Sequence, residues 1–382
     1  MKKPFCIAPW TTINISSTGK IRPCCYVKNF SFGSIYNGDT ISSVWNDTST
    51  INFREKMFDD IPPVECIRCV NSEKELGSSR RTFYNDYFTK KFLSGIHIDY
   101  NTTCSLDTLK HIDLSLGNMC TLQCKMCGSW GSNKWYSDDK ILGDEFDRIV
   151  HKPTCHTINQ FNDIFDKNLK YTGIDFKGGE PFIHPEHNLI LTKLIETGRS
   201  NEISLHYMTN GTRIDFKCIE LLTKFKNVKL SFSIEGSGKL YQYIRGGTDN
   251  TFDQIISNAK RVKSISDKID VNFSCTLMIY NMFNINTLVN TLAEEGFRVA
   301  LDNVVENPKY LSPFIAPQEL RVNAADQITI PYLQVFKNSL INIPDTLDSK
   351  ILFEKCKAFT RYFDTKNKTS LKEIVPEFKG YL

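Results

Sequence analysis

Asn118-Met-Cys-Thr-Leu-Gln-Cys-Lys-Met-Cys-Gly128 is the stretch that decides the fold of this 382-residue chain. Its cysteines, Cys120, Cys124 and Cys127, are separated by three and then two residues, so one tight loop carries three thiolates. Three sulfurs can hold three corners of a cubane [4Fe–4S] cluster and leave the fourth iron without a protein ligand. The alternative is a zinc site that takes its fourth ligand from elsewhere in the chain.

The composition is that of an ordinary globular protein, with 41% hydrophobic and 24% charged residues. A formal net charge of +4 without a long basic run gives no support to nucleic-acid binding. No apolar stretch reaches the roughly 20 residues that cross a bilayer, and the start, Met1 to Cys6, lacks the apolar core of a signal peptide. We therefore expect a cytoplasmic protein with no membrane partner, in which 13 cysteines serve metal binding better than disulfides.

Strand-like and helix-like segments alternate from about Lys110 onward, which predicts a parallel sheet. Six strands are fewer than the eight of a closed TIM barrel, so we predict an open, partial (β/α)6 barrel with its functional groups at the carboxyl ends of the strands. The expected strands are His111–Leu116, Thr172–Phe176, Ile203–Met208, Val228–Ile234, Val271–Ile279 and Val299–Val305. The expected helices lie around Lys140–Val150, Asn188–Gly198, Phe216–Phe225, Phe252–Ser264 and Ile285–Gly296.

The flanking regions have different patterns. Residues 11–16 alternate in period two, a turn follows at Gly19, and residues 20–24 return, which predicts a hairpin in a small cysteine-rich domain over residues 1–82. The polar and irregular residues 83–108 are expected to be a linker to the barrel at 109–306. Residues 307–382 are expected to form a helical extension, with helices around Ile330–Asn338 and Ile351–Asp364.

Four further motifs follow the expected strands in order. Two glycines let a ligand approach the backbone, and a carboxylate after them can bind a cationic amine. Polar strand ends can meet a ribose or a carboxylate, although each motif alone also fits a turn or a solvated surface charge. The motifs are Lys177-Gly-Gly-Glu-Pro181, Met208-Thr-Asn-Gly211, Leu230-Ser-Phe-Ser-Ile-Glu-Gly236 and Tyr241-Gln-Tyr-Ile-Arg-Gly246.

The cysteine loop and these motifs together resemble the radical S-adenosylmethionine (SAM) enzymes. The resemblance implies that Cys120, Cys124 and Cys127 hold a [4Fe–4S] cluster whose free iron binds SAM. It also implies a set of SAM contacts: Gly178, Gly179, Glu180, Pro181, Asn210, Ser231, Ser233, Glu235, Arg245 and Met126. Family members often carry an aromatic residue where Met126 stands and Asn where Thr121 stands; Met is apolar and adaptable enough to pack against an adenine.

A second cysteine group lies near the N-terminus. Four thiolates, Cys6, Cys24, Cys66 and Cys69, would form a closed site for zinc or for a fully ligated cluster, and Cys25 could replace Cys24. The Cys-x(n)-Gly-x(4)-Cys beginning resembles the SPASM/twitch accessory domain of radical SAM enzymes, here truncated and placed first. The resemblance implies one auxiliary [4Fe–4S] cluster, with zinc as the alternative.

The resemblance implies an activity but not a substrate. An external reductant of the reduced ferredoxin or flavodoxin type would supply an electron, SAM would be cleaved to a 5′-deoxyadenosyl radical, and this radical would abstract hydrogen from the substrate. SPASM and twitch enzymes often act on peptides, so we expect an oxidoreductase or maturase with a peptide substrate. The alternatives are a sugar or other small metabolite and, more distantly, a zinc-binding interaction module. No residue is assigned as catalytic acid or base.

Overall fold

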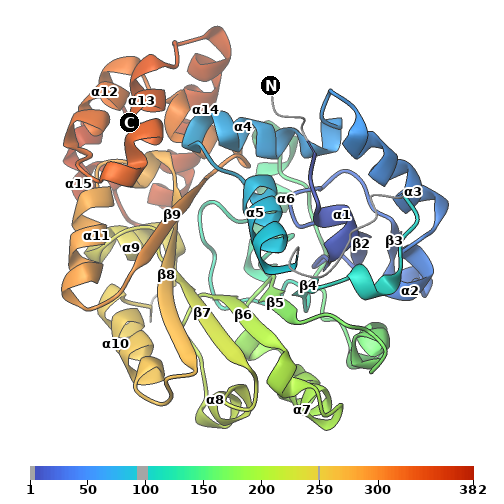
Figure 1. The fold of residues 1–382 in the computed structure, drawn as a ribbon. Helices are drawn as coiled ribbons and strands as arrows, with labels where there is room; N and C mark the ends of the chain where they lie inside the picture. The colour runs from blue at the N-terminus through green and yellow to red at the C-terminus, as the bar shows by residue number, and fades with distance from the viewer. Residues whose placement is uncertain (1–4, 93–101, 248–249) are drawn as a thin grey trace.

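The computed structural model describes residues 5–92, 102–247 and 250–382. A single nine-stranded sheet with the order β3-β2-β1-β4-β5-β6-β7-β8-β9 organises the chain (Figure 1). Strands β4 to β9 pair in parallel, as the alternating sequence pattern predicts. Their bounds are β4 His111–Ser115, β5 Gly173–Lys177, β6 Ser204–Thr209, β7 Asn227–Ser233, β8 Ile269–Leu277 and β9 Val299–Val304. The predicted partial barrel is therefore confirmed.

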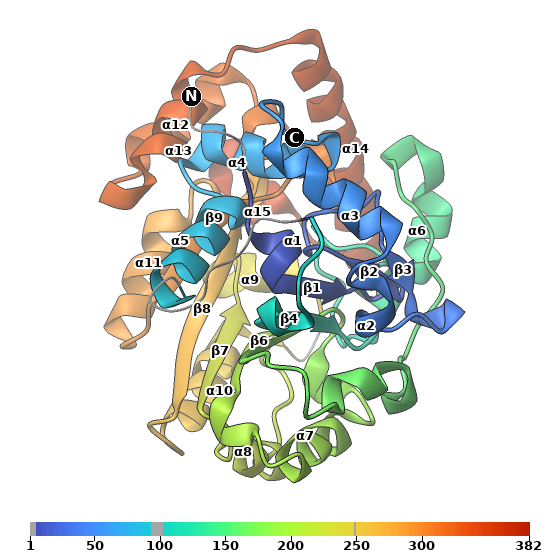
Figure 2. The same cartoon turned by 45° about the vertical axis from the view of Figure 1, so that its right-hand side comes forward.

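The helices that connect these strands lie outside the curved sheet (Figures 1 and 2). They are α7 His187–Glu196, α8 Phe216–Leu222, α10 Phe252–Lys263 and α11 Ile285–Glu294. Alternate strand residues pack against them: Phe176 of β5 stacks on Tyr207 of β6 with ring centroids 4.9 Å apart, and both rings meet the imidazole of His187 in α7 edge-on. The opposite, polar residues of the strands therefore face the interior of the barrel.

The N-terminal hairpin extends the barrel sheet instead of standing apart from it. Strands β1 Thr12–Ile15 and β2 Lys20–Arg22 pair antiparallel, and β3 Gly33–Ser34 follows β2. Strand β1 also pairs in parallel with β4, the first strand of the barrel. The hairpin was predicted from its alternation, but its pairing with β4 was not. Short helices complete this region: α1 Ala8–Thr11, α2 Ile41–Val44, α3 Thr48–Glu55 and α4 Ile67–Leu76.

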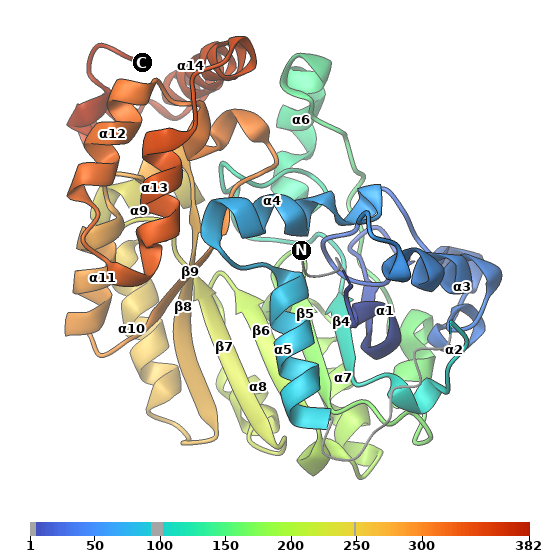
Figure 3. The same ribbon diagram turned by 45° about the horizontal axis from the view of Figure 1, so that its top comes forward.

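The same N-terminal region reaches the last strand of the barrel. Helix α4 packs against β9, and the Nε of Arg68 lies 2.9 Å from a carboxylate oxygen of Glu306. The hydroxyl of Tyr26 donates a hydrogen bond to Asn303 of β9 at 2.7 Å. Between these two attachments, helix α5 Arg80–Phe92 lies across the concave face of the sheet (Figures 1 and 3). The N-terminal region thus spans the open side of the barrel from its first strand to its last.

Several sequence-based expectations need correction. Residues 83–108 are not an irregular linker throughout, because α5 runs across the expected boundary at residue 82; residues 93–101 lie outside the described part of the chain. The helix expected over 140–150 is α6 Tyr136–Leu142 followed by a 3-10 turn, because Gly143 ends it. Helices α9 Gly238–Arg245 and α12 Gln318–Gln327 were not predicted.

The C-terminal extension packs behind the cysteine loop. Its remaining helices are α13 Gln334–Asn342, α14 Leu347–Asn367 and α15 Leu371–Ile374. Phe359 and Phe363 of α14 contact the fully buried ring of Trp135, with centroids 6.2 and 5.2 Å away. No helix among the described residues has the length and apolarity that crossing a bilayer requires.

Candidate functional site: two cysteine groups and the strand ends between them

The loop of Cys120, Cys124 and Cys127 begins five residues after β4 ends at Ser115 and is fixed by hydrogen bonds from several directions. The indole N–H of Trp135 donates to the carbonyl of Cys124 at 3.0 Å, and the backbone N–H of Lys125 donates to the carbonyl of Ile244 in α9 at 2.8 Å. A turn closes between Cys124 and Cys127, with an N···O distance of 2.9 Å. The loop is therefore held in place by its surroundings as well as by its own turn.

Burial raises the pKa of all three thiols, that of Cys127 to about 12. The three sulfurs lie close enough for charge on one to disfavour charge on another. The buried guanidinium of Arg245 opposes this effect at all three positions. Metal binding at this loop must therefore displace protons, and Arg245 offsets part of the negative charge that results.

The environment of the sulfurs fits an iron–sulfur group. The backbone N–H of Leu122 lies 3.5 Å from the sulfur of Cys120, and the amide nitrogen of Asn210 lies 3.7 Å from it. Such N–H···S contacts tune a cluster. A Cβ added to Gly131 would come within 3.0 Å of the sulfur of Cys127, so this glycine leaves room at the thiol. The predicted ligands Cys120, Cys124 and Cys127 are thus brought together with suitable neighbours.

The two glycines after β5 allow a close approach between backbones. Gly178 and Gly179 have φ angles of +75° and +60°, and a Cβ on Gly179 would lie 2.2 Å from the carbonyl oxygen of Met119 in the cysteine loop. The N–H of Glu180 donates to that same carbonyl at 2.7 Å. Pro181 follows at the start of a 3-10 turn. Only glycine allows this contact between the two loops.

The carboxylate of Glu180 is buried at the end of β6. It accepts hydrogen bonds from the hydroxyl of Thr209 at 2.8 Å and from the backbone N–H of Asn210 at 2.6 Å. Burial raises the pKa of Glu180 to about 7, and these hydrogen bonds and Arg245 oppose the rise. Because a carboxylate oxygen has two lone pairs, Glu180 retains capacity to accept from an ammonium group.

The other predicted SAM contacts fall into two groups. Asn210, Glu235 and Arg245 lie near the cysteine loop: a guanidinium nitrogen of Arg245 lies 3.0 Å from Glu235, and both side chains are buried. The hydroxyl of Ser231 instead donates to the amide oxygen of Asn272 at 2.8 Å and accepts from the imidazole of His206 at 2.9 Å, both on neighbouring strands. The last two, Ser233 at the end of β7 and Met126 in the loop, are partly buried, and Met126 packs against the aromatic cluster around Trp135.

The N-terminal cysteines gather from three separate segments. Cys6 precedes α1, Cys24 and Cys25 follow β2, and Cys66 and Cys69 lie at the start of α4. Burial raises the pKa of Cys6 and Cys24, and charges on the neighbouring thiols raise it further. Burial likewise raises the pKa of Cys66, to about 12.

Both Cys24 and Cys25 lie within electrostatic reach of Cys69. The charge of Arg81 opposes the rise in the pKa of Cys6 and Cys66. No group of three His, Cys, Asp or Glu side chains in residues 5–92, 102–247 and 250–382 is placed to hold a single metal ion.

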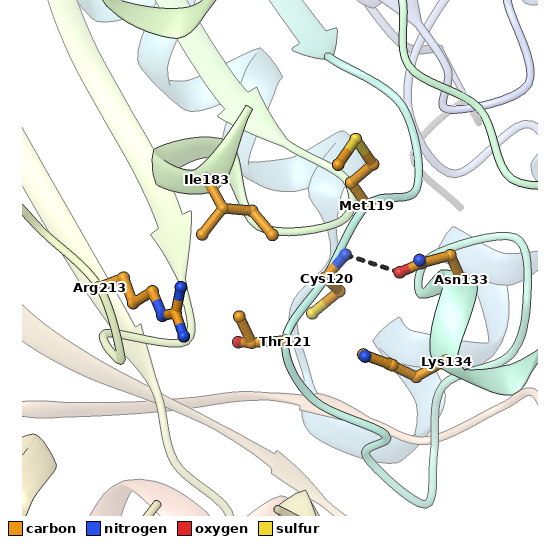
Figure 4. Close-up of a pocket in the computed structure, with 7 residues that line it drawn as sticks. All are labelled: Met119, Cys120, Thr121, Asn133, Lys134, Ile183 and Arg213. Carbon is orange, nitrogen blue, oxygen red and sulfur yellow. Dashed lines mark hydrogen bonds between the residues drawn. The ribbon is translucent and has the colours of Figure 1, made fainter. Parts of the chain in front are cut away.

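A pocket of about 370 Å³ opens beside the cysteine loop (Figure 4). Cys120 and Thr121 form one part of its lining, and the exposed cations Lys134 and Arg213 lie on either side of them. The amide oxygen of Asn133 accepts a hydrogen bond from the N–H of Cys120 at 3.0 Å. The loop is thus reached from solvent between two positive charges.

Some residues at the site were missed by sequence reasoning. Arg148 donates to the carbonyl of Cys127 at 2.8 Å and pairs with the buried Asp139 at 2.9 Å. The hydroxyl of Thr209 donates a hydrogen bond to the carboxylate of Glu180, and the indole N–H of Trp135 donates one to the carbonyl of Cys124. Thr209 could have been found as part of the Thr-Asn-Gly motif, whereas Arg148 lies in a segment whose sequence carries no such signal.

Comparison with known proteins gives two family matches and several distant structural likenesses. Residues 114–293 match the radical SAM superfamily, and residues 6–70 match the SPASM iron–sulfur cluster-binding domain; together they cover more than half of the chain. No curated protein matches the sequence.

Among solved structures, native anSMEcpe with bound AdoMet is 15% identical over 68% of this chain and 63% of its own, with a TM-score of 0.41. Streptococcus suis SuiB bound to precursor peptide SuiA is 15% identical over 80% of this chain and 66% of its own, with a TM-score of 0.37. TYW1 with a lysine-pyruvate adduct bound is 16% identical over 49% and 62%, with a TM-score of 0.31. The chain thus covers less than two thirds of the length of these structures.

A radical SAM domain implies a [4Fe–4S] cluster and SAM as cofactors, and a SPASM domain implies auxiliary iron–sulfur clusters. The radical SAM match begins in β4 and includes the loop of Cys120, Cys124 and Cys127. The SPASM match includes all five N-terminal cysteines. The chain is a member of the radical SAM superfamily with an N-terminal SPASM domain.

Proposed function

We propose that this protein is an oxidoreductase or maturase that cleaves SAM reductively and acts on a peptide or protein. The observation that carries the proposal is one continuous network: Asn210 contacts the sulfur of Cys120 through its side chain and Glu180 through its backbone. The cysteine loop and the proposed amine-binding carboxylate therefore meet at the ends of neighbouring strands, where a ligand can contact both.

The roles of the residues follow from this arrangement. Cys120, Cys124 and Cys127 would hold a [4Fe–4S] cluster, and this group would supply the electron for reductive cleavage of SAM to methionine and a 5′-deoxyadenosyl radical that takes hydrogen from the substrate. Glu180 accepts the SAM ammonium in its ionised form, and Gly178 and Gly179 leave the backbone open to it. Further SAM contacts are assigned to Pro181, Asn210, Ser231, Ser233, Glu235, Arg245 and Met126.

The N-terminal cysteines are proposed to hold one auxiliary cluster through Cys6, Cys66, Cys69 and either Cys24 or Cys25. Cys24 and Cys25 directly follow β2, a strand of the sheet that continues the barrel, which supports a role close to the barrel interior. The peptide substrate is favoured by the SPASM domain; a sugar or other small metabolite remains the second candidate. A gene for a precursor peptide beside this one would favour the first, and genes for sugar biosynthesis the second.

Anaerobic reconstitution with iron and sulfide tests the proposal. Two clusters predict roughly seven to eight irons per chain, and addition of SAM and dithionite should then produce 5′-deoxyadenosine. Binding of stoichiometric zinc without formation of 5′-deoxyadenosine would contradict the enzyme assignment and favour a zinc-binding interaction module. A reduced flavodoxin or ferredoxin is the proposed electron donor, and it is proposed to dock where Lys134 and Arg213 flank the pocket at Cys120.

A further inference from the structure

Buried cations surround the cysteine loop, and they differ in whether a carboxylate neutralises them. The Nε of Arg148 lies 2.9 Å from Asp139, and a guanidinium nitrogen of Arg245 lies 3.0 Å from Glu235. Each of these buried pairs is neutral overall. Lys125 lies inside the loop and is 3% exposed, yet it forms no ion pair with a carboxylate in residues 5–92, 102–247 and 250–382. Its charge is therefore not neutralised by the protein.

The ammonium of Lys125 lies over two aromatic rings. Its Nζ is 4.7 Å from the ring centre of Tyr243 in α9 and 4.3 Å from that of Phe363 in α14. Both rings are buried. The face of an aromatic ring attracts a cation but carries no net charge. The two rings therefore hold the ammonium in place without neutralising it.

The carboxylates on this side of the loop already have other donors. Asp364 of α14 accepts a hydrogen bond from the backbone N–H of Leu371 at 3.1 Å. Asp138 of α6 pairs with the ammonium of Lys366 at 2.5 Å. These contacts engage both carboxylates away from Lys125, although their charges still act on it at longer range.

Lys125 is charged at neutral pH, and its charge acts on the loop itself. It directly follows Cys124 in the sequence. Burial lowers the pKa of Lys125 to about 8, and the charges of Asp364 and Cys124 oppose this decrease, so the amine is protonated at pH 7. A buried ammonium without a paired carboxylate costs free energy. The negative charge of three thiolates in the same loop is of the sign that offsets this cost.

We propose that the Lys125 ammonium, held over the rings of Tyr243 and Phe363, is a fixed positive charge that raises the reduction potential of the [4Fe–4S] group at the cysteine loop. Reduction adds one electron there, so a positive charge nearby favours the reduced form. Helix α14 lies outside both family matches, and the inference gives it a role in electron uptake. It rests on the proposed function and deepens it, because it names a residue that favours reduction at that site.

The test is a redox titration of the anaerobic, reconstituted holoprotein at pH 7, followed by electron paramagnetic resonance. The signal to follow is the one that changes when SAM is added, because SAM binds at the iron without a protein ligand. Lys125→Met removes the charge at similar side-chain length. It should make one-electron reduction about tenfold less favourable, which corresponds to a potential lower by about 59 mV. An unchanged potential would overturn the proposal.

Two further variants separate charge from packing. Lys125→Arg keeps a cation over the rings and should restore a potential close to the native one. Lys140→Met is the matched control, because Lys140 lies over the ring of Tyr136 at 4.1 Å but is exposed on α6. Water and salt screen that charge, so the potential should not change. A potential in Lys125→Arg as low as in Lys125→Met, or an equal decrease in Lys140→Met, would overturn the proposal.

Phe363→Leu provides an independent variant if Lys125→Met does not fold or does not hold the cluster. It keeps the ammonium but removes one ring and admits water, so it should lower the potential by less than the loss of the charge itself. A native potential in this variant would overturn the role of the rings.

Formation of 5′-deoxyadenosine by the native preparation separates this inference from the proposed function. Product together with an unchanged potential in Lys125→Met refutes the inference alone. A native protein that gives neither product nor a signal sensitive to SAM contradicts the proposed function and this inference with it.

Discussion

The two cysteine groups of this protein are built in opposite ways. Cys120, Cys124 and Cys127 lie within one loop of eight residues that follows a central strand. The N-terminal cysteines come from three segments, and the first and last, Cys6 and Cys69, are brought together by the hairpin and the start of α4. A loop motif carries its ligand geometry locally, whereas the N-terminal group depends on the fold being complete.

This difference has a chemical counterpart. The cysteine loop has three thiols with Arg245, Asn210 and Glu180 beside them, so it leaves room for a ligand that contacts both the metal and the protein. The N-terminal group has enough thiols to close a site by itself. We therefore expect the loop to be the place of reaction and the N-terminal group to act in support of it.

The largest expected effect separates the two groups directly. Cys124→Ala should lower 5′-deoxyadenosine formation to the background level, because two thiolates do not retain the cluster that binds SAM. Cys66→Ala should keep SAM cleavage but block turnover of a substrate once one is known. Measurement uses chromatography of 5′-deoxyadenosine after addition of dithionite and SAM. An equal loss of 5′-deoxyadenosine formation in both variants would show that SAM cleavage requires both cysteine groups.

The next prediction concerns the close approach of Gly179 to the backbone of Met119 beside the cysteine loop. Gly179→Ala should weaken SAM binding by at least about tenfold, because its Cβ would lie 2.2 Å from the carbonyl of Met119 at a φ of +60°. Gly198→Ala is the matched control: its φ is +78°, but a Cβ there meets no atom within 4 Å. It should lose only about 1 kcal/mol of stability. Equal SAM affinity in both variants, measured by equilibrium binding, would refute the role of Gly179.

SAM binding should depend on pH through Glu180. Burial places the pKa of this carboxyl at about 7, and the SAM ammonium favours the ionised form. Affinity should therefore be nearly constant above pH 7 and fall by about tenfold for each pH unit below it. Glu180→Gln should bind weakly with little dependence on pH. The measurement compares SAM affinity at pH 5.5 and pH 8, which lie about one unit or more on either side of the pKa. Equal SAM affinity of the native protein at both values would show that Glu180 does not bind the SAM ammonium.

A smaller effect concerns electron supply to the loop. Lys134→Glu with Arg213→Glu should lower the ratio of the flavodoxin-driven rate to the dithionite-driven rate by about tenfold at low salt, because an acidic donor would meet reversed charge. The effect should shrink as salt is added. Lys355→Glu, distant in sequence and paired with Asp147, is the control and should leave the ratio unchanged. An unchanged ratio in the double variant would place the donor elsewhere.

The smallest expected effect concerns the attachment of the N-terminal group to the last strand. Arg68 pairs with Glu306 and its guanidinium lies 3.9 Å from the ring centre of Tyr26. Arg68→Ala should lower stability by about 1 kcal/mol, because both side chains are only partly buried. Denaturant unfolding measures this loss. A loss above about 3 kcal/mol would mean that the two regions are joined mainly through this contact.

The sequence predicts the local features of the molecule well. The six barrel strands were found from their apolar runs, and the cysteine loop from its spacing, because both signals lie within a few residues. The pairing of β1 with β4 was missed, since a parallel pair between distant strands leaves no local pattern. Helix α5 was missed because its polar and aromatic residues show no clear periodicity, although Tyr84 and Phe88 are buried against the sheet. Tertiary contacts determine both.

The pairing of β1 with β4 also sets an order of folding. Asn14 and Asp113 contact each other although they are 99 positions apart in sequence. The β1–β2 hairpin is synthesised first, and it cannot pair with β4 until the barrel begins to form. Long-range parallel pairing of this kind is slow and leaves strand edges exposed meanwhile. A chain shortened to remove the hairpin would leave β4 as an open edge, ready to pair with another molecule. The SPASM region is thus also a protective cover, and a barrel produced without it should aggregate.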